Sequence, residues 1–381
     1  TPLPNFCLYL DHMLPTSRSV GIGIIHASAS FSVLVPVIMT DLFQDRHLGI
    51  ALMSINIAGL VAIMVSVTFG SWVVSSGSPW QSGLIGVPLI AIVPLLCLLW
   101  AKNNLRNVQK HDKGIAKIFV DALSILSIKS FILLSATYSL TNFATAAYNF
   151  WFPSMYLIIW DTTPDIFLGI PYTVVTILNS GAMIVGMAMG IPTLMWFAQS
   201  WRYGTGLFEG RNEYLRAYPI VVSAGSSLNA ASFILSIIML DRSYLACLAS
   251  TFFVGIGTAA DASLSQQMML MVVPSSERAA AIALSRLISS IVGIPSAQIV
   301  GLIADLIRGD STLPSDRFHA YQLASLCASS LLIASVICFL LLAFSFNLDC
   351  EKAKEIKDKE EEEEADERTA LIEKEALLSK E

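Results

Sequence analysis

The stretch at residues 244–273 reads YLACLASTFFVGIGTAADASLSQQMMLMVV and decides the fold class. It is long enough to cross a bilayer as a helix, which takes about 20 mostly apolar residues. It contains one charged residue, Asp261, and two adjacent amides, Gln266 and Gln267. A carboxylate at bilayer depth costs about 2.5–3.5 kcal/mol on insertion scales, so it needs a partner or a water-filled cavity. We therefore expect a membrane helix whose polar side chains face the interior of a helix bundle.

The composition of the whole chain is that of a polytopic membrane protein. Of its 381 residues, 55% are hydrophobic and 14% are charged, whereas about one quarter of an ordinary soluble domain is charged. We expect an all-α fold, because the apolar segments are longer than β-barrel strands and lack their alternation. The six cysteines have no metal-ligand spacing and are expected to be apolar packing residues. The sequence predicts no metal, no cofactor and no nucleic-acid partner.

Nine segments are long and apolar enough to span the membrane. Turn-rich stretches such as DTTPD and RGDSTLPSDR separate them. The predicted spans are 19–40, 48–74, 82–101, 130–160, 171–198, 218–240, 244–273, 279–307 and 320–347.

Lysine and arginine residues predict the orientation, because basic loops stay on the cytosolic side. The tail and the loops on its side of the membrane contain 17 of these residues, and the opposite loops contain 3. We expect a lumenal leader at 1–17, three spans of an N-terminal bundle at 18–101 and a cytosolic loop at 102–128. A six-helix bundle at 129–347 and a cytosolic acidic tail at 348–381 follow.

Three helices, a basic loop and six helices resemble what remains of a transporter of the major facilitator superfamily without its first three helices. In that superfamily two six-helix bundles enclose a site near the bilayer midplane. The nine predicted spans would then be helices 4–12 of twelve, and the chain would be truncated at its N-terminus.

The segments SASFSVLVPVIMTDLF (28–43) and NFATAAYNFWFPSMYL (142–157) carry a narrower resemblance. They are similar to the fourth and the seventh helix of the Spinster family of lysolipid and sphingolipid transporters. VVPSSERAAAIALSRLISSIVGIPSAQIVGLIADLIR (272–308) is similar to the tenth-to-eleventh helix region. The resemblance implies a secondary transporter that moves a lysophospholipid or sphingolipid by alternating access in the lysosomal or late endosomal membrane.

This chain also departs from the family pattern. Where the family has a fourth-helix glutamate connected with proton coupling, the alignment gives Ser28 or, in a second register, Ile24. The family's histidine in the eleventh helix is replaced by Ser290. Proton coupling therefore does not follow from the resemblance.

Asp261 and Arg286 are the main candidates for a site within the membrane. Asp261 lies 13 residues before Pro274 in the short turn PSSER, and Arg286 lies 12 residues after it. At 1.5 Å per residue both lie about 18–20 Å from the turn, so the two side chains are expected at the same depth. Either they neutralise each other, or they share a lipid headgroup, the arginine binding a phosphate and the aspartate an amine. A purely structural ion pair is the alternative.

Other polar residues have two interpretations each. Gln266 and Gln267 point about 100° apart on a helix, so one at most faces a cavity squarely, and either can instead join helices. His26 could titrate near neutral pH in place of the missing glutamate, or it packs between helices. Arg18 could reach a headgroup or extend to the interface. With Ser28, these residues complete the predicted substrate path.

The tail contains two copies of an acidic-dileucine pattern. The residues are Glu367, Leu371 and Ile372, followed by Glu373, Leu377 and Leu378. The pattern occurs twice in a tail that is expected to be cytosolic, and it is typical of sorting to lysosomes and endosomes by clathrin adaptors. The alternative is that these residues form a short amphipathic helix. The acidic run before it is expected to be disordered.

Three other functions compete with lipid transport. A facilitator for a polar solute such as a sugar would need a wide polar site, and the candidate region is instead rich in Met, Leu and Ile. A non-transporting regulator or decayed transporter paralogue would fit the lost glutamate. An intramembrane enzyme is disfavoured, because no span carries paired aspartates, HExxH or GxSxG.

Overall fold

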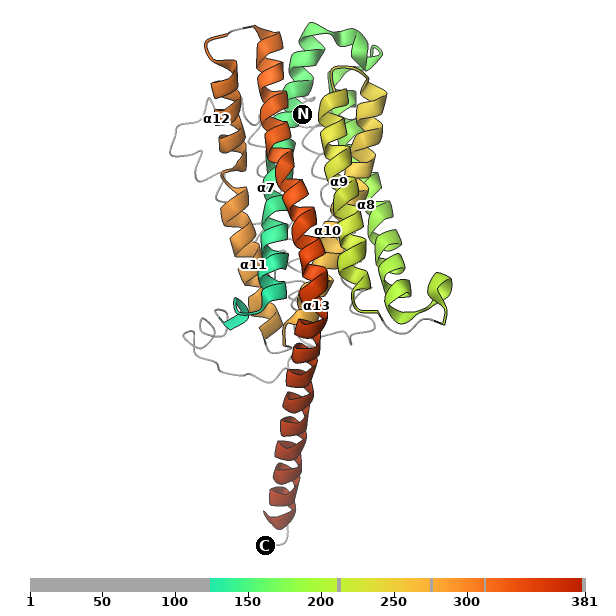
Figure 1. The fold of residues 1–381 in the computed structure, drawn as a ribbon, viewed down its shortest axis with the longest axis vertical. Coiled ribbons are helices and arrows are strands. Elements are labelled where there is room, and N and C mark those ends of the chain that lie inside the picture. The colour runs from blue at the N-terminus through green and yellow to red at the C-terminus, as the bar shows by residue number, and fades with distance from the viewer. Residues whose placement is uncertain (1–123, 211–213, 275–276, 312, 379–381) are drawn as a thin grey trace.

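A computed structural model describes residues 124–210, 214–274, 277–311 and 313–378 (Figure 1). The regular elements in these ranges are α-helices and two short 3-10 helices. The predicted spans 19–40, 48–74 and 82–101 lie outside the described residues, as do Arg18, His26 and Ser28. The count of nine spans therefore stays a prediction.

The helices follow the predicted spans of the C-terminal half closely. They are α7 (Lys129–Thr162), η2 (Pro164–Phe167), α8 (Tyr172–Tyr203), η3 (Gly206–Phe208), α9 (Ala217–Met239), α10 (Tyr244–Val272), α11 (Arg278–Gly293), α12 (Ser296–Arg308) and α13 (Pro314–Leu378).

Five helical segments in the described ranges are long and apolar enough to cross a membrane. They are Val174–Phe208, Ala217–Met239, Tyr244–Val272, Ala280–Arg308 and Pro314–Ile356. Helix α7 has 34 residues and covers the predicted span 130–160, but it is not among the five. Many of its buried residues are serine or threonine, which lowers its hydropathy.

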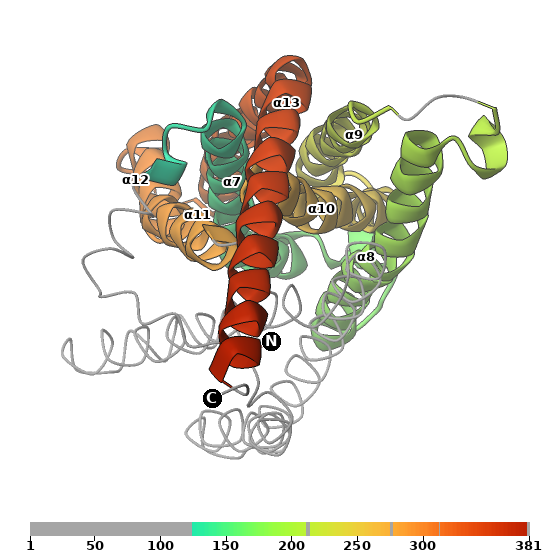
Figure 2. The same cartoon turned by 90° about the horizontal axis from the view of Figure 1, so that it is seen from below.

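In chain order, α7, α8 and α9 form one set of three helices, and α10, the α11–α12 pair and α13 form the other. The two sets interleave in space (Figure 2). The first helix of each set packs against the other set: α7 contacts α11, α12 and α13, and α10 contacts α8 and α9 (Figures 1 and 2). This exchange is expected of nested three-helix repeats, and it makes neither set a separate packing unit.

Glycines allow α8 and α10 to approach closely. A side-chain carbon at Gly186 would overlap the backbone of Phe252, and one at Gly255 would overlap the backbone of Met183. In lipid no hydrophobic effect drives helices together, so close backbone packing supplies much of the association energy. Gly181, in the same helix as Gly186, differs: a side-chain carbon there would have no neighbouring atom within 4 Å.

The predicted span 279–307 is divided, which the hydropathy pattern did not indicate. Helix α11 ends at Gly293 and α12 begins at Ser296. Pro295 between them has no N–H and cannot donate to the carbonyl four residues earlier, so a continuous hydrogen-bond ladder is impossible there. The two helices nevertheless form one apolar crossing, Ala280–Arg308.

Helix α7 holds both halves of this broken span. Asn142 Nδ2 donates a hydrogen bond of 3.1 Å to the carbonyl of Ser289 before the break. Trp151 Nε1 donates one of 2.8 Å to the carbonyl of Ala297 after it. Bonds to backbone oxygens on both sides fix the register of α7 against the broken span.

The acidic run of the tail, which was expected to be disordered, is helical. Helix α13 has 65 residues and continues beyond the bundle to Leu378 (Figure 1). Extending an existing helix adds one hydrogen bond per residue without the cost of a new nucleus. The tail is also rich in Glu, Lys and Ala, which favour helix. The high charge of the acidic run predicted disorder, but the run continues the transmembrane part of α13 and so needs no new helix nucleus.

The close approach of α8 and α10 makes a direct prediction. Gly186→Leu should destabilise the bundle by about 1–3 kcal/mol, because the new side chain forces two backbones apart. Gly181→Leu is the matched control: it gains the same helix propensity in the same helix, and its first side-chain carbon has no neighbouring atom within 4 Å. Thermal unfolding of the purified protein in detergent measures both. Equal melting temperatures for the two variants would contradict the observed contact.

Candidate functional site

Asp261 lies on α10 and is buried against α9. Its side chain is 4% exposed. Ser226 Oγ donates a hydrogen bond to Oδ1, and Asn229 Nδ2 donates one of 3.4 Å to Oδ2. Gly257 lies one turn earlier on α10, where a side-chain carbon would meet the backbone of Asn229. The missing side chain lets α9 come close enough for its short polar groups to reach the carboxyl group.

Two further hydroxyls extend this site to α7 and α13. Thr141 on α7 lies near the Asp261 carboxyl group. Its Oγ1 also lies 3.1 Å from Ser335 Oγ on α13. Asp261, Ser226, Asn229, Thr141 and Ser335, the polar cluster, therefore join four helices. All of the donors are neutral, so the cluster satisfies the carboxyl group by hydrogen bonds alone.

The predicted ion pair between Asp261 and Arg286 is not present among the described residues, and the alternative in which the two residues share a headgroup stays a prediction. The guanidinium carbon of Arg286 lies 4.7 Å from the centre of the Tyr138 ring, in a cation–π contact with α7. No ion pair joins Arg286 to a carboxylate within the described ranges. Sequence spacing places both residues at one depth but does not give their directions. Helix α11 packs mainly on α7, whereas α10 turns Asp261 toward α9.

The two glutamines differ in their surroundings. Gln267 Nε2 donates a hydrogen bond of 3.1 Å to the hydroxyl of Tyr218, which joins α10 to α9. The guanidinium carbon of Arg202 lies 5.6 Å from the centre of the same tyrosine ring. Gln266 Nε2 is buried and has no hydrogen-bond partner among the described residues. The geometry assigns Gln267 the helix-joining role that was one of its two interpretations.

Sequence reasoning missed the partners of both charged residues. Ser226 and Asn229 are three residues apart on an apolar helix, a spacing that puts them on one face. That pattern was a usable signal for a buried acceptor on a neighbouring helix. Tyr138, in contrast, carries no signal that separates it from other aromatic residues of α7.

Within the described ranges, no three His, Cys, Asp or Glu side chains form a metal-binding group.

The polar cluster predicts opposite results for two substitutions of Asp261. Asp261→Asn should keep the bundle folded, because an amide oxygen still accepts the bond from Ser226. Asp261→Leu should destabilise it by about 1–3 kcal/mol, because buried donors lose their acceptor. Thermal unfolding in detergent compares them. If Asn destabilises as strongly as Leu, a cation must pair with Asp261, and the cluster of neutral donors is not the native arrangement.

The known proteins to which this chain is similar include two Spinster proteins. No family model matches the chain. It is 27% identical over 310 residues to Protein spinster homolog 1 of Xenopus tropicalis, which covers 79% of this chain and 56% of the relative. It is 25% identical over 359 residues to the Sphingosine-1-phosphate transporter SPNS2 of the same species, covering 91% of this chain and 66% of the relative. The chain thus spans less than two thirds of the length of either relative.

A solved structure shares the fold. It is a bacterial homologue of the human lysosomal transporter Spinster, in an inward-facing and unoccupied conformation. The TM-score is 0.50 at 13% sequence identity, and 86% of each chain is covered. The names of the second relative and of the solved structure state transport as the activity of those proteins. The resemblance predicted from the sequence is confirmed: this chain is similar to Spinster proteins over most of its length, and it is a multi-pass integral membrane protein with the major facilitator fold.

Proposed function

We propose that the protein is a secondary transporter of a single-chain lipid with a phosphate headgroup, a lysophospholipid or a sphingoid phosphate, and that it works by alternating access. The observation that carries this proposal is Arg286. It lies within the apolar crossing Ala280–Arg308, and no carboxylate of the described ranges neutralises it. An ionisable side chain in a membrane span is expensive and usually marks a substrate path.

The surroundings of Arg286 fit an anion better than a cation. The Tyr138 ring supports one face of the guanidinium and leaves its N–H groups available. Guanidinium matches phosphate with two parallel hydrogen bonds, which an ammonium group cannot do. Asp261, which could have neutralised the charge, is occupied by Ser226 and Asn229. The arginine is thus positioned to bind the phosphate of a substrate.

Apolar side chains next to Arg286 fit the hydrocarbon chain of such a substrate. Leu287, Ile291 and Ile294 are 57%, 63% and 51% exposed. Their spacing of four and three residues places them on one stripe of α11 and its C-cap, about 100° around the helix from the arginine. A charged headgroup site beside an apolar stripe suits an amphipathic lipid better than a sugar. The name of one relative, a sphingosine-1-phosphate transporter, supports the same chemistry.

Arg286→Gln should lower the transport of a fluorescent lysophosphatidic acid into proteoliposomes at least about tenfold, because a charge-assisted hydrogen bond contributes about 1.5–3 kcal/mol. Arg286→Lys should retain part of the activity, since it keeps the charge but not the planar geometry. Arg242→Gln, in the turn between α9 and α10, is the matched control. Unchanged transport by Arg286→Gln contradicts the proposal. So does a melting temperature that falls with the activity, which would give Arg286 a structural role.

We also propose that the tail sorts the protein to late endosomes or lysosomes and that the end of α13 is cytosolic. The two acidic-dileucine patterns and the basic residues on that side of the bundle support this orientation. Replacing Leu371, Ile372, Leu377 and Leu378 with alanine should move a fluorescent fusion from lysosomes to the plasma membrane. Replacing Glu351 and Glu355 with alanine, in the same helix but before both patterns, should leave it in lysosomes. Lysosomal retention of the first variant would show that another signal directs sorting.

A further inference from the structure

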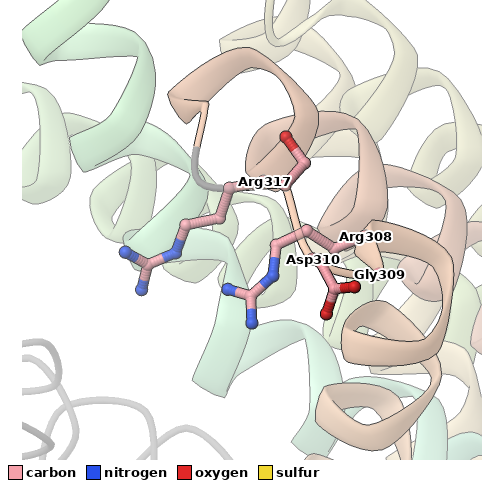
Figure 3. Close-up of a pocket in the computed structure, with 5 residues that line it drawn as sticks. Arg308, Gly309, Asp310 and Arg317 are labelled. Atoms are coloured by element: carbon pink, nitrogen blue, oxygen red, sulfur yellow. The ribbon is translucent and has the colours of Figure 1, made fainter.

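A pocket lined by two arginines and an aspartate lies at the end of the bundle opposite the tail, where α12 turns into α13 (Figure 1). Its volume is about 400 Å³, and it is lined by Arg308, Gly309, Asp310, Ser311 and Arg317. Arg308 ends α12, and Arg317 lies in the first turn of α13. Figure 3 shows that both guanidinium groups extend in the same direction from the turn. The pocket thus brings together two positive charges from consecutive helices.

Neither arginine has all of its N–H groups paired with acceptors among the described residues. Arg308 Nη2 lies 3.1 Å from Asp305 Oδ1, but its Nε is buried and has no hydrogen-bond partner among the described residues. The guanidinium carbon of Arg317 lies 5.7 Å from the centre of the Tyr321 ring, and no ion pair holds it within the described ranges. A ligand with several acceptor oxygens could bind both groups at once.

Exposed apolar side chains flank the pocket. Leu306, two residues before Arg308, is 83% exposed, Ile307 is 45% exposed, and Leu313 in the following loop is 59% exposed. Apolar side chains this exposed at the end of a membrane helix lie against acyl chains, so the adjoining arginines lie at the depth of lipid headgroups.

The position of the two arginines is itself unusual. In the orientation proposed above this end of the bundle is lumenal, and basic residues are rare on that side. Within 129–347, the loops there contain three, Arg242, Arg308 and Arg317, and two of these three line one pocket. A specific anionic partner would explain their retention.

We propose that this pocket binds the headgroup of a zwitterionic membrane phospholipid. Arg308 and Arg317 bind the phosphate, and the Asp310 carboxylate faces the amine or choline. Asp310 lines the same pocket, makes no ion pair within the described ranges and would repel a second negative charge on the lipid. Phosphatidylcholine and phosphatidylethanolamine carry both charges that the pocket matches; phosphatidylglycerol lacks the positive one.

Native mass spectrometry of the delipidated full chain, titrated with short-chain phosphatidylcholine, tests this site without any transport step. The double variant Arg308→Gln, Arg317→Gln should weaken binding roughly tenfold or more, because charge-assisted hydrogen bonds to the phosphate are lost. Arg242→Gln, on the same side of the bundle, should bind as the wild type does. The double variant Arg308→Lys, Arg317→Lys, which keeps both charges, should retain part of the binding. Its melting temperature and that of the double glutamine variant show whether a loss of binding is due to misfolding.

Further titrations identify the ligand. Phosphatidylglycerol should bind more weakly than phosphatidylcholine to the wild type, and Asp310→Asn should reduce that difference. A neutral diacylglycerol should not compete. Displacement of phosphatidylcholine by millimolar inorganic phosphate alone would overturn the lipid assignment in favour of a free phosphate site. Equal binding by the wild type and the double variant would overturn the site itself. Either result leaves the transport proposal at Arg286 unaffected, because that proposal rests on a different helix and a different measurement.

Discussion

The close approach of α10 to its two neighbours is the constraint on which the rest of the structure depends. Gly255 lets α10 meet the backbone of α8, and Gly257 lets it meet the backbone of α9. Side-chain carbons at these positions would overlap neighbouring backbone atoms. In lipid such contacts replace the hydrophobic effect as the source of helix association. They also place the short polar side chains of α9 within reach of Asp261, one turn further along α10.

The electrostatics of the bundle follow from that contact. Because Ser226 and Asn229 satisfy the Asp261 carboxyl group, the only acidic residue of α10 is not available to Arg286. Arg286 instead lies over the Tyr138 ring, on the α7 side of the broken α11–α12 span. The two charged residues thus have different functions in our proposal: one joins helices, and the other binds substrate. The pocket at Arg308 and Arg317 is a third polar feature, independent of both.

The helices were largely predictable from the sequence, whereas the polar contacts were not. Runs of apolar residues between turn-rich stretches report bilayer length directly, so the segments at 171–198, 218–240 and 244–273 match α8, α9 and α10 closely. The rise per residue also predicts a common depth for Asp261 and Arg286. Their partners were not predictable, since these depend on which helices pack together: Asp261 accepts hydrogen bonds from α9, and Arg286 contacts Tyr138 of α7. The break at Pro295 was missed because hydropathy does not respond to a single absent N–H group.

The most direct test of this division of roles is an electron cryomicroscopy map of the full chain in nanodiscs with a bound lysophosphatidic acid. The proposal predicts that the phosphate density lies within hydrogen-bond distance of Arg286, while Asp261 keeps its contacts with Ser226 and Asn229. A map in which Asp261 turns to pair with Arg286, or in which the phosphate binds away from Arg286, would contradict it.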